Sequence, residues 1–159
     1  MRVERLAVMT RVMRKGMTLR EFFQEAVRSN VPGLPYVDEH GRIVGRMSIR
    51  HVCKLIAVPS SILRLADAMG DQTDKLDLSE RRVLEALDSP VEDYLLENIP
   101  TVSPSSAIVK ALAIMEAYNT NYIFLIEEGE YVGVVTRMVI AERMLDWLQE
   151  LDDAKSPPP

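Results

Sequence analysis

The fold of this chain is decided by one stretch near the N-terminus, LPYVDEHGRIVGRMSIRH, residues 34–51. Apolar residues flank an acidic turn that contains Gly41, and this pattern is the sequence signal of a β-hairpin. After Ser48 the apolar residues fall at positions 49, 52, 53 and 56, which is helical spacing. Ser48 is therefore predicted to be the N-cap of a helix that follows the second strand directly.

The chain contains this stretch a second time, as IFLIEEGEYVGVVTR at residues 123–137. Gly45 corresponds to Gly133, and Ser48 corresponds to Thr136 at the same offset. Upstream of the turn the offset is one residue larger, and the apolar helical positions before each hairpin follow it. A self-match with one indel, located in a turn, indicates a duplicated supersecondary unit. Each copy is predicted to run strand, helix, strand, turn, strand, helix.

The repeated pattern resembles a pair of CBS domains, a tandem regulatory arrangement often called a Bateman module. The resemblance rests on the two hairpins, on Val8-Met9-Thr10 and on TVSP at residues 101–104, and it covers residues 6–57 and 90–148. It implies a mixed α/β (α+β) fold, in which two β-α-β-β-α units pack face to face. The expected divisions are a first repeat at 1–57, a helical linker at 58–89, a second repeat at 90–151 and a frayed tail at 152–159.

Local signals refine this outline. Thr18 and Glu21 form a capping box for the first helix. In the linker, helical spacing predicts segments over 62–69 and 77–88, the second capped by Asp77 and Glu80. The linker is read as a spacer that packs on the repeats or on a second copy, with a docking surface for another protein as the alternative. Further helices are expected at 105–118 and 137–151, and a short helical turn at 90–95.

Composition narrows the class of protein. The 159 residues carry a net charge of −5, which argues against a nucleic-acid partner. A single cysteine, Cys53, excludes an internal disulfide, and two histidines leave no obvious metal site. No apolar run is long enough to span a membrane. We expect a cytoplasmic protein, either free-standing or a piece of a larger one.

The strand-to-helix junctions at Ser48 and Thr136 are the candidate binding sites. A helix N-terminus offers backbone N–H groups and partial positive charge, and the nearby Arg46, Arg50 and Arg137 add cations. Such a corner can hold a phosphate group. The alternative is that both hydroxyl residues are ordinary helix caps.

The resemblance adds a specific ligand class. CBS pairs form clefts for adenosine-type ligands such as AMP, ADP, ATP or S-adenosylmethionine, in which apolar residues sandwich the adenine and an Asp three residues after the hydroxyl residue holds the ribose. Here His51 and Val139 occupy the two Asp positions. A neutral histidine still offers one donor and one acceptor, whereas valine offers neither. Most of the expected ligand contacts therefore lie in the first repeat. They are Ser48, His51, Arg46, Arg50 and Pro35, and the second repeat adds Thr136 and Arg137.

The function predicted from these observations is a non-catalytic regulatory module that senses an adenine nucleotide and requires no cofactor. The residues offer neither a nucleophile elbow nor a Walker-type glycine loop, which argues against an enzyme. The alternative is a CBS-like pair that has lost nucleotide binding and serves in oligomerisation or docking. A third reading is a part of the enzyme or transporter that it regulates. The apolar stripe from Met138 to Leu148 predicts a homodimer.

Overall fold

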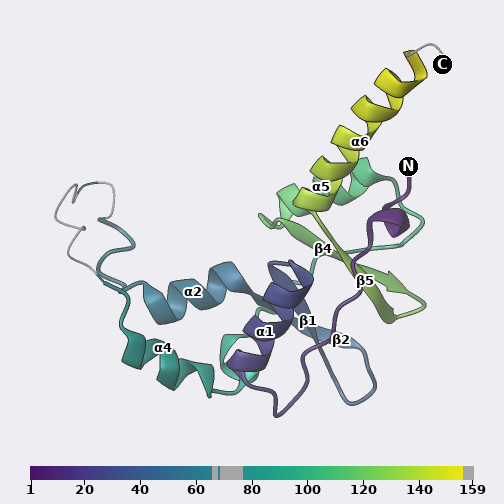
Figure 1. Ribbon diagram of the computed structural model, residues 1–159. Coiled ribbons are helices and arrows are strands. Elements are labelled where there is room, and N and C mark those ends of the chain that lie inside the picture. Colours follow the sequence, from purple (N-terminus) through teal and green to yellow (C-terminus); the bar gives the residue numbers. More distant parts are fainter. Residues whose placement is uncertain (66–67, 69–76, 156–159) are drawn as a thin grey trace. The chain divides into compact units, whose positions relative to one another are not determined.

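The computed structural model describes residues 1–65, 68 and 77–155, the last four of these by backbone alone (Figure 1). They group into two compact units, one made of residues 1–10 and 98–159 and the other of residues 11–97. Each unit contains one β-hairpin with its flanking helices. The chain therefore passes from one unit to the other twice, after Thr10 and after Glu97.

The unit of residues 11–97 is built around the first predicted hairpin. Its elements are α1 (Leu19–Ser29), β1 (Gly33–Val37), β2 (Ile43–Ser48), α2 (Ile49–Ala57), α4 (Glu80–Leu87) and the 3-10 helix η3 (Val91–Tyr94). Strands β1 and β2 pair antiparallel, with Leu34 opposite Met47. In the turn, the Asp38 carboxylate accepts hydrogen bonds from the backbone N–H groups of His40 and Arg42, both at 2.9 Å. The predicted hairpin is confirmed.

Helix α1 begins at the predicted capping box. The Thr18 hydroxyl accepts a hydrogen bond from the backbone N–H of Glu21 at 3.4 Å, and the Glu21 carboxylate accepts one from the Thr18 N–H at 2.8 Å. The predicted apolar positions Leu19, Phe22 and Ala26 are buried. The helix therefore begins where the sequence places it. Of the predicted apolar face, Phe23 is only half-buried and Val27 is 74% exposed, so the face is buried in part.

The linker differs from its prediction. Helix α4 is capped by Ser79, whose hydroxyl accepts from the N–H of Arg82 at 3.4 Å, and the predicted Asp77–Glu80 capping pair is wrong. Asp77 instead accepts from the N–H of Leu78, the residue beside it, at 2.8 Å. Of the helix predicted over 62–69, residues 61–65 form turns, and residues 66, 67 and 69 lie outside the described ranges.

The unit of residues 1–10 and 98–159 contains the second hairpin. Its elements are the 3-10 helix η1 (Val3–Leu6), β3 (Thr101–Val102), α5 (Ile108–Ala117), β4 (Tyr122–Glu127), β5 (Glu130–Thr136) and α6 (Arg137–Lys155). The strand order is β3-β4-β5, with β3 parallel to β4. Val3 and Leu6 belong to the core of this unit, with Ile108, Met115 and Ile123.

The helix ends of this unit depart from the predicted ones. Helix α5 begins at Ile108 and not at residue 105, because residues 103–106 form a turn closed by a hydrogen bond from the Ser106 N–H to the Ser103 carbonyl. Helix α6 continues to Lys155, past the predicted end at 151. The remaining residues of the predicted tail, 156–159, lie outside the described ranges.

The two repeats exchange their leading segments, which explains why repeats and compact units divide the chain differently. Val8 pairs antiparallel with Val134, at N–O distances of 2.8 and 3.0 Å. Leu96 pairs in the same way with Arg46, at 2.9 Å in both directions. Val8 lies two residues after η1 and Leu96 two residues after η3, so they are equivalent positions of the repeats, and Val134 corresponds to Arg46. Each leading segment therefore extends the sheet of the other repeat's hairpin.

The repeated glycines lie where these segments cross the hairpins. Gly133 has φ +150, and a Cβ on it would approach the Ala7 Cβ to 3.1 Å and the Val8 carbonyl oxygen to 3.3 Å. Gly45 is less crowded, since a Cβ there would lie 3.6 Å from the Leu96 carbonyl oxygen. The duplicated glycine thus permits the close approach of a backbone segment that comes from the other repeat.

Candidate functional site

The first candidate site lies at the corner where β2 ends and α2 begins. Ser48 ends the strand opposite Gly33, and the first helical N–H, that of Ile49, donates to the Pro32 carbonyl at 2.9 Å. Ser48 is 7% exposed and holds the N-cap position, as predicted, but its side chain makes no capping hydrogen bond. The N-cap position of Ser48 was therefore predicted correctly, but the predicted capping hydrogen bond does not form. The Ser48 hydroxyl therefore does not bond to the backbone N–H groups at the start of α2.

Two of the predicted contact residues meet in the same hairpin. Pro35 lies directly opposite Arg46 in the β1–β2 register, and both residues are buried. Arg46 and Ser48 are two residues apart on one strand, so their side chains leave the same face. Arg50 follows in the first turn of α2 and is exposed. The corner therefore combines a hydroxyl, a helix N-terminus and two guanidinium groups.

His51 is half-buried in the first turn of α2. Burial lowers its pKa below 6.5, and the positive charges of Lys54 and Arg46 lower that pKa further. At neutral pH the imidazole is uncharged, with one donor and one acceptor nitrogen. The charged groups that contribute to this shift, Lys54 and Arg46, are both cations.

The second corner, between β5 and α6, is chemically different. Thr136 is 3% exposed, and its hydroxyl accepts a hydrogen bond from the Val139 N–H at 3.2 Å, as expected for a helix cap. The Arg137 guanidinium donates to the Thr120 carbonyl at 3.3 Å and pairs with Glu116 at 2.7 Å. Both polar side chains of this corner therefore already have partners within their own unit.

The structure brings the first five candidate residues together in the unit of residues 11–97, and Thr136 with Arg137 in the other unit. Across the described ranges, no group of three or more His, Cys, Asp or Glu side chains is arranged to hold a metal ion. Over the same ranges, no helix has the length and apolar character needed to cross a membrane.

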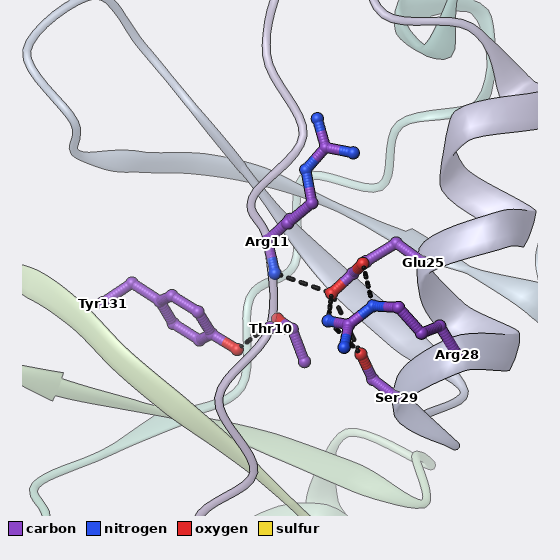
Figure 2. Close-up of polar contacts among 6 residues, drawn as sticks. All are labelled: Thr10, Arg11, Glu25, Arg28, Ser29 and Tyr131. Atoms are coloured by element: carbon purple, nitrogen blue, oxygen red, sulfur yellow. Dashed lines mark hydrogen bonds and ion pairs between the residues drawn. The ribbon is translucent and has the colours of Figure 1, made fainter.

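Sequence reasoning missed a buried carboxylate on α1. Glu25 is 3% exposed and accepts hydrogen bonds from Arg28 at 2.6 and 2.9 Å, from the Arg11 backbone N–H at 2.8 Å and from Ser29 at 2.9 Å (Figure 2). These donors, Arg28 first, lower its pKa to about 2. The available signal was its position on the apolar face of the helix, between Phe22 and Ala26.

Comparison with known proteins supports one family. The CBS domain pattern matches residues 6–58 and 91–146. An uncharacterized protein of Methanocaldococcus jannaschii is 38% identical over 64 residues, which are 38% of this chain and 34% of that protein. The A-adding tRNA nucleotidyltransferase of Aquifex aeolicus is 21% identical over 140 residues, or 88% of this chain and 14% of the enzyme. The chain thus spans about a third or less of these two relatives.

Solved structures show the same fold. A putative acetoin utilization protein (AcuB) from Vibrio cholerae superposes with a TM-score of 0.64 at 14% identity, over 99% of this chain and 98% of that one. A CBS domain-containing protein of unknown function from Kribbella flavida gives 0.64 at 21% identity, over 91% and 99%. The CBS domain pair of protein MJ0100, in complex with 5-methylthioadenosine and S-adenosyl-L-methionine, gives 0.62 at 17%, over 91% and 95%. With the family pattern matched in both repeats, this chain belongs to the CBS domain family as a tandem CBS pair.

Proposed function

We propose that this CBS pair is a non-catalytic regulatory module that senses an adenine nucleotide at the Ser48 corner. The observation that carries the proposal is the Ser48 hydroxyl, which sits at the start of α2 without a capping bond. Thr136, in the equivalent place, uses its hydroxyl to cap α6. A neighbour of the same fold, protein MJ0100, was crystallised with adenosyl ligands.

The charges around this corner favour a phosphate-bearing ligand. Arg46 and Lys54 act on His51, and Arg50 lies beside it in the same helical turn. A nucleotide phosphate would gain from these cations and from the α2 N-terminus. The sulfonium and ammonium groups of S-adenosylmethionine would be repelled by the same charges. We therefore expect AMP, ADP or ATP to bind more tightly than S-adenosylmethionine.

The ribose contacts limit affinity and stoichiometry. Neutral His51 can satisfy one ribose hydroxyl, where a carboxylate would accept from two. Val139 at the equivalent place in the second repeat leaves ribose hydroxyls unpaired, which disfavours binding by roughly 1–3 kcal/mol for a buried group. The expectation is weak binding of one nucleotide per chain, at the corner formed by Ser48, His51, Arg46, Arg50 and Pro35.

Isothermal titration calorimetry with AMP, ATP and S-adenosylmethionine tests the proposal. Ser48→Ala should weaken nucleotide binding by about 10- to 100-fold, the loss of one hydrogen bond to a charged group. Thr136→Ala should change it little, and His51→Asp should strengthen it by supplying two acceptors. Two equivalent sites, or binding lost in Thr136→Ala and retained in Ser48→Ala, would reverse the assignment.

A second candidate function is supported by the last helix. Helix α6 presents exposed apolar side chains along its length, among them Met138, Leu145 and Leu148. Together with Val139 at a ribose position, this surface suits a pair that has lost nucleotide binding and acts in oligomerisation or docking to a regulated enzyme or transporter. Thermal unfolding decides between the two, because a nucleotide that binds only the folded chain must raise the Tm.

A further inference from the structure

A cavity lies at the opposite end of the first hairpin from Ser48. It has a volume of about 540 Å³, within the range of small-molecule sites. The strands β1 and β2 pair from Gly33 and Ser48 at one end to Val37 and Ile43 at the other, and the cavity surrounds the turn end. It is therefore separate from the corner proposed to bind a nucleotide.

The cavity is lined by two cations from adjacent positions of the sequence. Arg14 and Lys15, on the loop before α1, line one side, and in the part of the chain that the structure describes their side chains make no ion pair or hydrogen bond. The lining Asp38 is already neutralised, since its carboxylate pairs with the Arg42 guanidinium at 3.2 Å. Glu39 is the remaining charged group of the lining. Positive charge therefore exceeds negative charge in the cavity.

The apolar part of the lining is held in place by hydrogen bonds. The Tyr36 hydroxyl donates to the Glu92 Oε1 at 3.1 Å, and the Gly16 N–H donates to the same oxygen at 3.2 Å. Burial and this acceptor raise the pKa of Tyr36, so the hydroxyl stays protonated. Glu92 thus fixes the aromatic ring and the loop that carries Lys15. The Tyr36 ring and the backbone of this loop are therefore positioned before any ligand arrives.

The second repeat lacks this arrangement at the equivalent place. Ser103 and Pro104 occupy the positions of Arg14 and Lys15. The hollow beside the second hairpin turn, about 370 Å³, is lined by Val132 and by three glutamates, Glu127, Glu128 and Glu130. An anion attracted to the first turn would be repelled from the second, which provides a control within the same chain.

We propose that this cavity binds a small organic anion, with its anionic group on Arg14 and Lys15 and its apolar or aromatic body against Tyr36 and Val44. A carboxylate and a phosphate would use the same two cations. Glu39 lies in the same lining and opposes an anion. The sign of the Glu39 effect therefore reports the charge of the ligand.

Titration of the full chain with phenyl phosphate, followed by backbone amide chemical shifts, tests the site. We expect a Kd on the order of a millimolar for so small a probe. The shifts should centre on Lys15, Tyr36 and Val44 and leave Glu128 and Gly129 unmoved. Benzyl alcohol, which is uncharged, and benzylamine, which is cationic, serve as comparison probes and should bind less tightly.

Three variants of the cavity and one control variant sharpen the test. Arg14→Ala and Lys15→Ala should each weaken phenyl phosphate binding about 3- to 10-fold, and Glu39→Gln should tighten it. Arg50→Ala removes a cation from the other end of the hairpin and should leave these shifts unchanged. Equal or tighter binding of benzylamine would overturn the proposal, and so would affinity for phenyl phosphate that survives both Arg14→Ala and Lys15→Ala. Amide spectra of the free variants show whether each is folded.

Failure here is distinguishable from failure of the nucleotide site. Ligand-induced changes in amide chemical shift around Ser48 that are absent in Ser48→Ala report binding at the nucleotide corner, and they are no evidence for the cavity. Shifts around Lys15 and Val44 that persist in Ser48→Ala, and weaken in Lys15→Ala, support the cavity alone.

Discussion

At the scale of single residues, buried Glu25 is the clearest departure from a simple hydrophobic face. Its carboxylate lies on the core side of α1 and is compensated by Arg28, by Ser29 and by the Arg11 backbone N–H. The Arg28 side chain is itself exposed, so solvent weakens the ion pair. The donors together still hold the pKa of Glu25 at about 2.

This shift predicts a defined loss of stability in acid. The pKa of Glu25 is lowered from its ordinary value of 4.5 to about 2 in the folded chain, so its contribution is complete above pH 4.5 and is lost as the pH falls towards 2. After allowance for screening by water, we expect about 2 kcal/mol of unfolding free energy to be lost over that interval. Urea unfolding at pH 5.5 and 2.5 measures it.

Glu25→Gln provides the comparison. The variant should be less stable than the wild type at pH 5.5, and its stability should fall less between pH 5.5 and 2.5, because the titrating group is absent. Glu39→Gln, an exposed change in the same unit, is the matched control. Parallel pH profiles for the wild type and Glu25→Gln would contradict the assignment.

The repeated glycines predict unequal effects of one substitution. Gly133→Ala introduces a Cβ at φ +150 and within 3.1 Å of Ala7, so we expect a loss of roughly 1–3 kcal/mol in unfolding free energy. Gly45→Ala meets its neighbours at 3.6 Å or more and should cost less than about 1 kcal/mol. Denaturant unfolding of both variants measures the two losses of unfolding free energy. Equal losses would contradict the prediction, because they would show that Gly45 and Gly133 are equally crowded by the segments that pass them.

At the scale of elements, the exchange of leading segments ties residues 1–10 to the core of the second repeat. Val3 and Leu6 of η1 are buried beside Ile108 and Met115, and Thr10 shares a hydrogen bond of 2.8 Å with Tyr131 (Figure 2). The N-terminal segment is therefore a structural part of a unit that lies far along the sequence.

This arrangement predicts a remote effect of an N-terminal substitution. Leu6→Ala should destabilise the chain by about 2–4 kcal/mol, as expected for a buried leucine. Met9→Ala, an exposed apolar residue in the same segment, should have an effect below about 0.5 kcal/mol. Amide hydrogen exchange should show the loss at Val135 of β5. Faster exchange confined to residues 1–10 would contradict a shared core.

At the scale of the whole molecule, α6 leaves an apolar stripe uncovered. Met138, Leu145 and Leu148 are 65%, 66% and 59% exposed, and they follow one another at helical spacing. In Figure 1 the helix extends beyond the strands of its own unit. An exposed stripe of this kind is the surface expected at a helix-mediated interface between copies.

We predict a homodimer in which this stripe is buried. Light scattering at micromolar concentration should give twice the 18.0 kDa mass of the chain. Leu145→Glu should shift the mass to that of the monomer, because it places a charge in an apolar contact. Glu150→Gln, a change on the opposite, exposed face of the same helix, should leave the dimer intact. A wild-type mass near that of one chain would remove the prediction.

The sequence by itself determined the features that depend on neighbouring residues. The two hairpins, the capping box of Thr18 and Glu21, and the Thr136 cap all follow from turn chemistry and from periodicity over a few positions. The duplication, read from the same local patterns, was enough to identify a CBS pair. Local signals failed in the linker, where Ser79 and Asp77 are both able to cap and their competition decides the helix start.

Only the tertiary structure decided what depends on residues distant in the sequence. The pairing of Val8 with Val134, the hydrogen bond from the Arg11 N–H to Glu25 and the grouping of Lys15 with Tyr36 join segments whose spacing carries no periodic signal. The state of the Ser48 hydroxyl was also decided by the tertiary structure. The sequence specifies a residue able to cap α2, but it does not specify whether the capping hydrogen bond forms. Hydrogen bonding and burial at these positions are set by long-range packing, which no local pattern encodes.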